Sequence, residues 1–488
     1  MNTLRSRTAL SKIARICCSA AFGLVVVSVV AAPSPCSAQA VLLTVGPHGT
    51  YPTIQGALAG VISGGINDVR IETGTYVENV VFQGIVGGEL HLSGGWDPTF
   101  ATQTANAALT VIDGNGAGRC LEIAFSPPSS TLVRVTNMTL TGGQDTTGGG
   151  LRFSTFQRAR LEISDCVIDG NTAVASVGQP YGGGVYADVS GVGSSLTIRD
   201  TTIAHNLAWD QASSGGVRGG GAYVVIGDSA PVIIERVLFQ SNQANATVEI
   251  AGVGLWLRVN AGTVAWVNDS QFIYNQAISS ATPQVVGTGL YVETHSGWAR
   301  LRRNTLYINQ SQTGTGDQLQ VGAWETSQLR VGDTVVAGGD EGVGAVAFDT
   351  AIIDLTNLTV VNNAGGGIYV RLADPTATAS LHNSIAYGNG FDLTLQPGAG
   401  TIANSHNLVG VDPVFINPAG YNLRLSAGSP AENAGTNTPP AVLGDADCDG
   451  GVRLIDGTAD IGAYEGIDVL FSDGFALRTS RWSEVVGD

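Results

Sequence analysis

Lysine is almost absent from this chain, and charged residues of either sign are scarce. Lys12 is the single lysine in 488 residues, and only 13% of the residues are charged. Residues 1–38 hold four of the 23 basic residues and no acidic one, so the rest of the chain has 19 basic and 40 acidic residues, a formal charge of −21. Without basic patches to neutralise phosphates, the chain is not expected to bind nucleic acid. Cations, neutral glycans and proteins remain open as partners.

A long apolar run is also missing, except near the N-terminus. There, four basic residues precede an apolar run at residues 16–32, and small residues follow at Cys36-Ser37-Ala38. This order predicts an export signal at residues 1–38 that is removed from the mature chain. The run is short and Pro33 follows it, so a membrane anchor is the less favoured alternative. The mature protein is therefore expected to be secreted or held at a cell surface.

What the chain does contain is a repeat. Apolar and polar residues alternate through most of it, whereas a helical period is hard to find. Nine positions align with Asp200 at spacings of 24 to 36 residues, and the residue three places further on is apolar in all nine. The nine are Asn137, Asp165, Asp200, Arg236, Asp269, Arg303, Asp333, Asn357 and Asn383. This period predicts a solenoid with one coil per repeat and about three short strands per coil.

Two positions of the repeat predict how each coil turns. A bend is expected at the Asp200 position. Six residues further on, a corner residue is Asn in seven of the nine repeats and Gly in two. Both residue types tolerate left-handed backbone angles. An Asn side chain also hydrogen-bonds its counterpart in the next coil, about 4.8 Å away.

From Asp200 to Asp333, the bend column alternates in sign, as Asp, Arg, Asp, Arg and Asp. Stacked carboxylates suit calcium or acid–base chemistry, but alternating signs favour a self-neutralising ladder between neighbouring coils. Three cysteines follow residue 38, so at least one is unpaired. Cys120 and Cys166 either bridge stacked coils or are buried as small apolar residues.

The repeat resembles the right-handed parallel β-helix proteins of the pectate-lyase-like class. Its glycine-marked corners at residues 182–186, 287–291 and 365–369 resemble the coils of bacterial polymorphic outer-membrane-protein repeats. Residues 43–58 resemble the entry of pectate-lyase-like chains, in which a strand and a short helix cover the open end. The resemblance implies an all-β solenoid, with an N-terminal cap and first coils at 39–105 and further coils at 106–410.

The C-terminal part resembles a different unit. Val411-Asp412-Pro413-Val414-Phe415 and Ala459-Asp460-Ile461-Gly462-Ala463-Tyr464-Glu465 match the choice-of-anchor Q module that ends many secreted bacterial β-helices. Residues 411–466 are therefore expected to form a β-rich capping module ahead of a variable anchor. Residues 467–488 resemble a short C-terminal tail of secreted proteobacterial proteins. This resemblance implies that the mature protein lies outside a bacterium or on its outer surface.

Aromatic residues recur at one position of the repeat. Each follows an inward-facing apolar residue, so alternation along the strand turns its ring outward. A row of exposed rings is suited to stacking on a polysaccharide, whereas rings covered by the insertions of variable length form a packing ladder. The candidate ligand-binding residues are Tyr186, Tyr223, Trp256, Tyr291 and Tyr369, with Trp324 as a further member.

One acidic segment has the spacing of a calcium loop. Asp445, Asp447 and Asp449 stand at positions 1, 3 and 5, Gly450 at position 6 and Asp456 at position 12. Carboxylates at these positions and a glycine at the sharp turn are what calcium requires. Position 12 carries Asp in place of the usual bidentate Glu, and the flanks are not helical. The same stretch also fits an ordinary segment of the anchor module.

Catalytic signatures of the pectate-lyase-like enzymes are missing. A lysine base is excluded, and neither an adjacent Asp-Asp pair nor Gly-His-Gly occurs. His205, His295, His382 and His406 have no partner that spacing reveals. We therefore expect a secreted or cell-surface, non-catalytic protein that binds glycan or another surface. The alternatives are a calcium-assisted, arginine-based lyase or a hydrolase acting on an acidic polysaccharide, and a purely structural spacer.

Overall fold

The computed structural model describes residues 39–466, apart from residues 86, 212–214, 280, 442 and 456. The predicted export signal and the predicted C-terminal tail both lie outside the described residues. Within the described part of the chain, no helix is long and apolar enough to cross a membrane.

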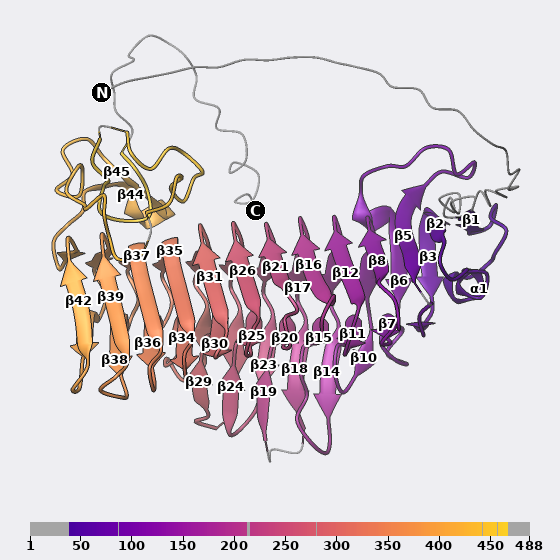
Figure 1. The fold of residues 1–488 in the computed structure, drawn as a ribbon, viewed down its shortest axis with the longest axis horizontal. Helices are drawn as coiled ribbons and strands as arrows, with labels where there is room; N and C mark the ends of the chain where they lie inside the picture. Colours follow the sequence, from indigo (N-terminus) through magenta and orange to yellow (C-terminus); the bar gives the residue numbers. More distant parts are fainter. Residues whose placement is uncertain are drawn as a thin grey trace, which may run out of the picture. The chain divides into compact units, whose positions relative to one another are not determined.

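Nearly all of the regular structure is β-strand, and the strands of successive coils stack in parallel (Figure 1). Because each coil repeats the same alternation, its strands pair in register with their counterparts in the next coil, as Ile198 does with Ile234. The coils are stacked in chain order, so neighbours in the sequence are neighbours in space. The chain is a parallel β-helix, the fold class that its repeat predicts.

Among the described residues, the largest sheet, sheet A, has 23 strands in two columns that meet at the bend. Its first column consists of β1 (Ala40–Val45), β2 (Ile66–Glu72), β5 (Gly88–Trp96), β8 (Thr131–Thr136), β12 (Ala159–Ser164), β16 (Ser195–Arg199), β21 (Val232–Glu235), β26 (Val264–Asn268), β31 (Trp298–Arg302), β35 (Gln328–Ala337), β37 (Ile352–Val361), β39 (Thr378–His382) and β42 (Thr401–Ser405). The second column is formed by the ends of β35 and β37 together with β3 (Gly74–Val77), β6 (Thr110–Asp113), β9 (Thr139–Thr141), β13 (Val167–Asp169), β17 (Thr202–Ala204), β22 (Leu238–Gln240), β27 (Gln271–Ile273), β32 (Thr305–Tyr307), β40 (Ile385–Tyr387) and β43 (Leu408–Val409).

Three further parallel sheets complete the coils in the part of the chain that the structure describes. Sheet B has 11 strands, namely β4 (Val80–Phe82), β7 (Leu121–Ala124), β11 (Leu151–Thr155), β15 (Val185–Val189), β20 (Ala222–Ile226), β25 (Leu255–Val259), β30 (Leu290–His295), β34 (Asp317–Trp324), β36 (Glu341–Ala347), β38 (Gly366–Leu372) and β41 (Phe391–Gln396). Sheet C is formed by β10 (Gln144–Asp145), β14 (Thr172–Ala175), β18 (Leu207–Asp210), β23 (Gln243–Asn245), β28 (Gln276–Ile278) and β33 (Gln310–Ser311). Sheet D, on the longest insertions, is formed by β19 (Gly216–Arg218), β24 (Glu249–Ala251) and β29 (Gln284–Val286).

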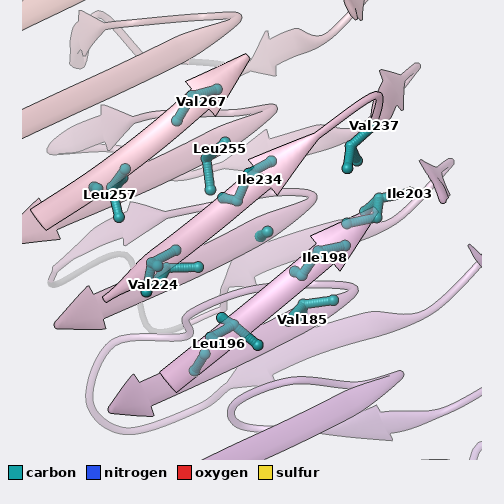
Figure 2. Packing of buried hydrophobic residues seen from close by; sticks show 14 of the residues in the cluster. Val185, Leu196, Ile198, Ile203, Val224, Ile234, Val237, Leu255, Leu257 and Val267 are labelled. Atoms are coloured by element: carbon teal, nitrogen blue, oxygen red, sulfur yellow. The ribbon is translucent and has the colours of Figure 1, made fainter. Parts of the chain in front are cut away.

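The inward-facing residues of sheets A and B fill the interior of the coils (Figure 2). In one coil, Leu196 and Ile198 of β16 meet Val185 of β15, and all three are fully buried. Burying an aliphatic side chain of this size contributes about 1.5–3 kcal/mol. Because the same positions are apolar in each repeat, the buried layers join into one continuous core.

The bend predicted at the Asp200 position is present in all nine repeats. Every residue of this column has a left-handed backbone, with φ between 47° and 56°. Asn and Asp enter this conformation more readily than other non-glycine residues, which accounts for their frequency here.

The predicted charge ladder forms in part. Arg236 binds Asp200 at 2.7 Å, and Arg303 binds Asp269 at 2.6 Å. The prediction that the ladder continues along the bend column to Asp333 is wrong, because the carboxylate of Asp333 is bound by Arg302 and Arg453.

The corner asparagines form a ladder along the coils. Asn206 Nδ2 donates to Asn242 Oδ1 at 3.0 Å, and Asn242 Nδ2 donates to Asn275 Oδ1 at 3.0 Å. At the Gly339 coil, Gln318 fills the gap, since it accepts from Asn309 at 2.9 Å and donates to Asn363 at 2.8 Å. The left-handed angle expected of the asparagines lies instead on the residue before each one, such as His205 with φ 51°.

The N-terminal end of the coils is covered as predicted. Helix α1 (Ile54–Leu58) is capped by Thr53, whose hydroxyl accepts from Gly56 N–H at 3.1 Å. Glu78 accepts from the N–H groups of Ile54 and Gln55 at 2.9 and 3.0 Å, so a carboxylate lies at the positive end of the helix. The buried side of the helix, Ile54, Ala57 and Leu58, joins the core of the first coils.

The C-terminal module, residues 411–466, covers a flank of the β-helix. It contains one antiparallel pair, β44 (Phe415–Asn417) with β45 (Asn422–Leu425), and the short helix η2 (Pro418–Gly420); a second short helix, η1 (Ala107–Leu109), lies in the first coils. The apolar residues of the C-terminal module pack against the second column of sheet A. They form a separate cluster that includes Val335, Ala337, Val361, Ile385, Phe415, Leu423, Leu425, Ile461 and Tyr464. In the described residues, the last strand β42 pairs only with β39, so the module lies beside the coils, rather than across the last one.

The three cysteines of the described residues are unpaired. Cys120 and Cys166 are buried, and each thiol donates to a backbone carbonyl, Cys120 to Thr141 at 3.0 Å and Cys166 to Ser164 at 3.2 Å. The interpretation as small buried residues is confirmed, and the disulfide alternative is wrong.

Candidate functional site

The outer face of sheet B holds the predicted aromatic column. Strand pairing places Tyr186, Tyr223, Trp256 and Tyr291 opposite one another on four successive coils. Their inward neighbours are apolar and fully buried, so alternation turns the rings outward as expected. Tyr369 belongs to the same column but is separated from Tyr291 by Gln320 and Gly344.

The rings stack on one another. The Tyr186 and Tyr223 centroids are 5.3 Å apart with an interplanar angle of 5°, and the Tyr223 and Trp256 centroids are 4.5 Å apart at 3°. Tyr291 meets Trp256 edge-on, with centroids 6.4 Å apart at 67°. Since ring faces are used within the ladder, the tyrosines offer mainly their edges and hydroxyls to a ligand.

Insertions of neighbouring coils partly cover the column. Tyr181 stacks on Tyr223 at 4.6 Å, and the Arg218 guanidinium lies 5.5 Å from the Trp256 ring. Trp256 is only 1% exposed, so the expectation of an exposed ring is wrong at this position. Tyr186, Tyr223 and Tyr291 remain half-buried, and burial raises the pKa of all three phenols, which therefore stay protonated donors.

Trp324 is not a member of the column. It pairs with His295, four residues along the strand from Tyr291, and its ring stacks on the imidazole at 4.8 Å and on Phe348 at 4.9 Å. A second, shorter aromatic row therefore runs beside the first on the same face of sheet B.

Between the two rows lies a polar cluster that spacing did not reveal. Glu293, 7% exposed, forms an ion pair with Arg258 and accepts from the Tyr291 hydroxyl at 3.2 Å. The Arg258 guanidinium lies 3.4 Å from His295 Nε2. Burial, with the charge of Arg258 as a second cause, lowers the pKa of His295. The cluster therefore offers a neutral imidazole beside a protonated phenol and a guanidinium, a set of groups able to bind sugar hydroxyls or transfer a proton.

Asp317 and Glu341 add a second acidic element one coil further on. They stand opposite each other at the starts of β34 and β36. Gln320 and Asp317 both extend into the space that a side chain at Gly344 would fill. Burial, followed by the neighbouring Glu341, raises the pKa of Asp317 to about 8, so most of this carboxyl group is protonated at neutral pH.

The cluster of Arg258, Glu293 and His295 can be found in the sequence once the coils are aligned. Arg258 and Glu293 stand two residues after their column aromatics and are in register on neighbouring strands, and His295 stands four residues after Tyr291. Such even spacings place all of them on the outer face. The recurrence of one residue type identifies the aromatic column, whereas this cluster combines different residue types and forms no repeat.

The acidic loop at residues 445–450 does not gather its carboxylates. Asp447 accepts from the N–H groups of Gly451 and Glu465 at 2.7 and 3.1 Å, and Asp449 binds Arg424 at 2.6 Å. Asp445 is exposed, and Asp456 lies outside the described residues. Among residues that the structure describes, no group of three or more His, Cys, Asp or Glu side chains is placed to hold a metal. Calcium binding stays an untested prediction.

A cavity of about 360 Å³ separates this loop from the bend column. Its lining includes Asp200, Arg236, Asp269 and Arg303 on one side and Cys448, Asp449 and Gly450 on the other. Both arginines of the lining form ion pairs, Arg236 with Asp200 and Arg303 with Asp269, and Asp449 pairs with Arg424. These charges of the cavity are therefore neutralised.

Comparisons with known proteins add little beyond the fold. No family model matches the chain, and no curated protein matches it. Among solved structures, an alginate lyase from Paenibacillus sp. str. FPU-7 is similar, with 15% sequence identity and a TM-score of 0.29 over 76% of this chain and 99% of that chain. A likeness of this extent carries no conclusion about activity, and the fold assignment rests on the strand pairing itself.

Proposed function

We propose that this chain is an exported polysaccharide-binding protein that holds its ligand on the outer face of sheet B, between Tyr186 and Tyr291. The observation that carries the proposal is the tyrosine ladder with its cluster of Arg258, Glu293 and His295. A solvent-facing strand of a β-helix requires neither stacked aromatics nor partly buried ion pairs. The ring edges and hydroxyls of rigid tyrosines, beside planar polar groups, are a combination that contacts the C–H groups and hydroxyls of a sugar.

The charges of this face favour a polysaccharide with few charges of its own. Arg152 binds Glu122 at 2.8 Å, Arg218 binds Glu249 at 3.4 Å, and Arg258 is paired with Glu293. Because each of these guanidiniums already has a carboxylate, the face lacks the surplus positive charge that a polyanion needs. Paired groups still have free lone pairs and N–H donors for sugar hydroxyls.

A second candidate function, cleavage of the polysaccharide, is favoured by the two acid–base elements. Asp317 is a protonated acid near neutral pH and would give its proton to the leaving glycosidic oxygen in hydrolysis, with water as the second reactant. Alternatively, in a polysaccharide that contains uronate, the neutral imidazole of His295 would remove the ring proton next to the carboxylate. The glycosidic C–O bond would break to leave an unsaturated sugar, and water would protonate the leaving oxygen. Perturbed pKa values near a binding face are typical of catalytic sites.

Both candidates are tested by incubating the purified protein with neutral and acidic polysaccharides, with and without calcium. Retention of a neutral polysaccharide without new products supports binding. New reducing ends alone indicate hydrolysis, and unsaturated products indicate elimination. If no polysaccharide is retained or cleaved under any condition, the proposal is wrong and the structural spacer is favoured.

A further inference from the structure

A second surface, on the outer face of sheet A, gathers arginines instead of aromatics. Strands β31, β35 and β37 place Arg300, Arg330 and Asp354 in one row. The next row on the same face consists of Arg302, Gly332 and Thr356. Except for Asp354, the residues of these rows line a cavity of about 210 Å³ that Ala441 and Gly444 of the C-terminal module close from the other side.

The cavity has more positive than negative charge. Arg302 Nε donates to Asp333 at 2.7 Å, and Arg330 Nε donates to Asp354 at 3.2 Å. Arg453, behind the cavity, binds Asp333 at 2.5 Å and Glu465 at 2.8 Å. The four arginines 300, 302, 330 and 453 thus face three carboxylates, and within the described residues Arg300 has no ion-pair partner. Burial and the charge of Arg302 lower the pKa of Arg300, which marks an uncompensated cation.

A hydroxyl group at the wall also lacks a partner. The side chain of Thr356 is buried and makes no hydrogen bond in the described part of the chain. Thr356 is 5% exposed and lines the cavity. A buried hydroxyl without a partner is destabilising, and an oxyanion in the cavity would accept a hydrogen bond from it.

The cavity is kept open by glycine. Gly332 stands between Arg302 and Thr356, and a side-chain carbon added there would come no closer than 3.6 Å to a neighbouring atom. The space is therefore free for a ligand and is not required by packing. Since a water molecule occupies about 30 Å³, the cavity accommodates an oxyanion together with several waters or part of the molecule that carries it.

We propose that this arginine cavity is an oxyanion-binding site that takes a carboxylate, sulfate or phosphate group. Arg300 supplies the unpaired charge, Arg302 and Arg330 supply further N–H donors already oriented by carboxylates, and the Thr356 hydroxyl donates the remaining hydrogen bond. Planar guanidinium groups are the preferred partners of oxyanions. The site lies on sheet A and shares no residue with the proposed polysaccharide face, so either proposal can fail without the other.

The test measures the melting temperature and the binding heat of the full protein with sodium sulfate, phosphate or acetate, against sodium chloride at equal ionic strength. The wild type is expected to show a saturable rise in melting temperature and a saturable heat with at least one oxyanion. A response to sulfate or phosphate alone indicates that the natural ligand is a free inorganic ion or its ester. A response to acetate indicates that the ligand carries a carboxylate.

Three variants distinguish the site from a general salt effect. Arg300→Gln and Gly332→Val are expected to weaken binding at least tenfold, the first by removing the free charge and the second by filling the space. Arg371→Gln, which removes an exposed arginine of sheet B, is expected to bind as the wild type does. In chloride, Arg300→Gln should melt no lower than the wild type, because an uncompensated charge is removed. Equal responses of all four proteins, or no saturable heat, would overturn the proposal.

Discussion

Single side chains inside this β-helix act through contacts with the coils on either side. Asn242 is fully buried, and its amide donates to Ile203 O at 2.8 Å and to Asn275 Oδ1 at 3.0 Å. Its oxygen accepts two hydrogen bonds from Asn206, from the backbone N–H at 3.1 Å and from the amide at 3.0 Å. One side chain thus satisfies buried groups of the two neighbouring coils.

Removing this amide should therefore be costly. We expect Asn242→Ala to lower the free energy of unfolding by about 3 kcal/mol, because donors and an acceptor are left buried without partners. Gln243→Ala, at the exposed neighbouring position, is the control and should cost less than about 0.5 kcal/mol. Urea unfolding followed by circular dichroism measures both, and equal midpoints for the two variants would contradict the ladder's role.

Asp317 predicts a pH dependence of stability. Its pKa is raised from 3.8 to about 8 in the folded protein, so the folded state holds this proton more tightly than the unfolded chain does. Its contribution is complete below about pH 4 and is lost as the pH rises through 8. Between pH 4 and 8, the free energy of unfolding should fall less steeply for Asp317→Asn than for the wild type. The two slopes should differ by up to about 1.4 kcal/mol per pH unit. Identical slopes in thermal melts of the two proteins would be inconsistent with this account.

At the scale of the element, the bend column shows how backbone and charge requirements combine. Asp269 has φ 52° and also binds Arg303 at 2.6 Å. Its side chain is 29% exposed, so the ion pair contributes less than about 1 kcal/mol. The left-handed backbone is the stronger requirement, since a β-branched residue there is strained by about 1–2 kcal/mol.

Two substitutions at this position separate the requirements. Asp269→Asn keeps a residue that tolerates the bend and should cost less than about 1 kcal/mol, an effect that salt removes. Asp269→Val should cost about 1–2 kcal/mol more, independently of salt. Unfolding in low and high salt measures both, and an Asn variant as unstable as the Val variant would show that charge dominates the bend.

The same columns explain which features the sequence predicts. Bends, the asparagine ladder and the outward aromatics each need one residue type at one place in each coil, so they appear as a repeat. Gln318 completes the asparagine ladder from a different strand, because the corner of that coil is Gly339. The cluster of Arg258, Glu293 and His295 depends on register between outer faces, and insertions of variable length hide that register in the sequence.

At the scale of the whole molecule, the contacts of the C-terminal module cannot be predicted from spacing. Arg453, 1% exposed, reaches Asp333 in a bend 120 residues earlier. The resemblance of residues 411–466 to the choice-of-anchor module predicts a unit at the end of the coils, but no periodicity indicates where it docks. The arginine cavity is created by this docking, and so it too is absent from any sequence pattern.

Arg453 should hold the module onto the β-helix. Arg453→Met is expected to cost about 3–5 kcal/mol, because Asp333 and Glu465 would keep buried charges without their partner. Arg424→Met removes a partly exposed ion pair with Asp449 from the same module and should cost less than about 1 kcal/mol. Calorimetry of both variants measures the difference, and a loss for Arg453→Met as small as that for Arg424→Met would argue against docking through this residue.

The central claim is that sheet B binds a polysaccharide through its tyrosine ladder. The most direct measurement is calorimetric titration of a retained polysaccharide into the wild type, the Tyr186→Ala/Tyr223→Ala double variant, and Trp209→Ala. Trp209 is an exposed aromatic, 39% accessible, on sheet C, and controls for nonspecific ring contacts. We predict at least tenfold weaker binding for the double variant, or about 1.4 kcal/mol, and unchanged binding for Trp209→Ala. Equal affinities for all three proteins would contradict the claim.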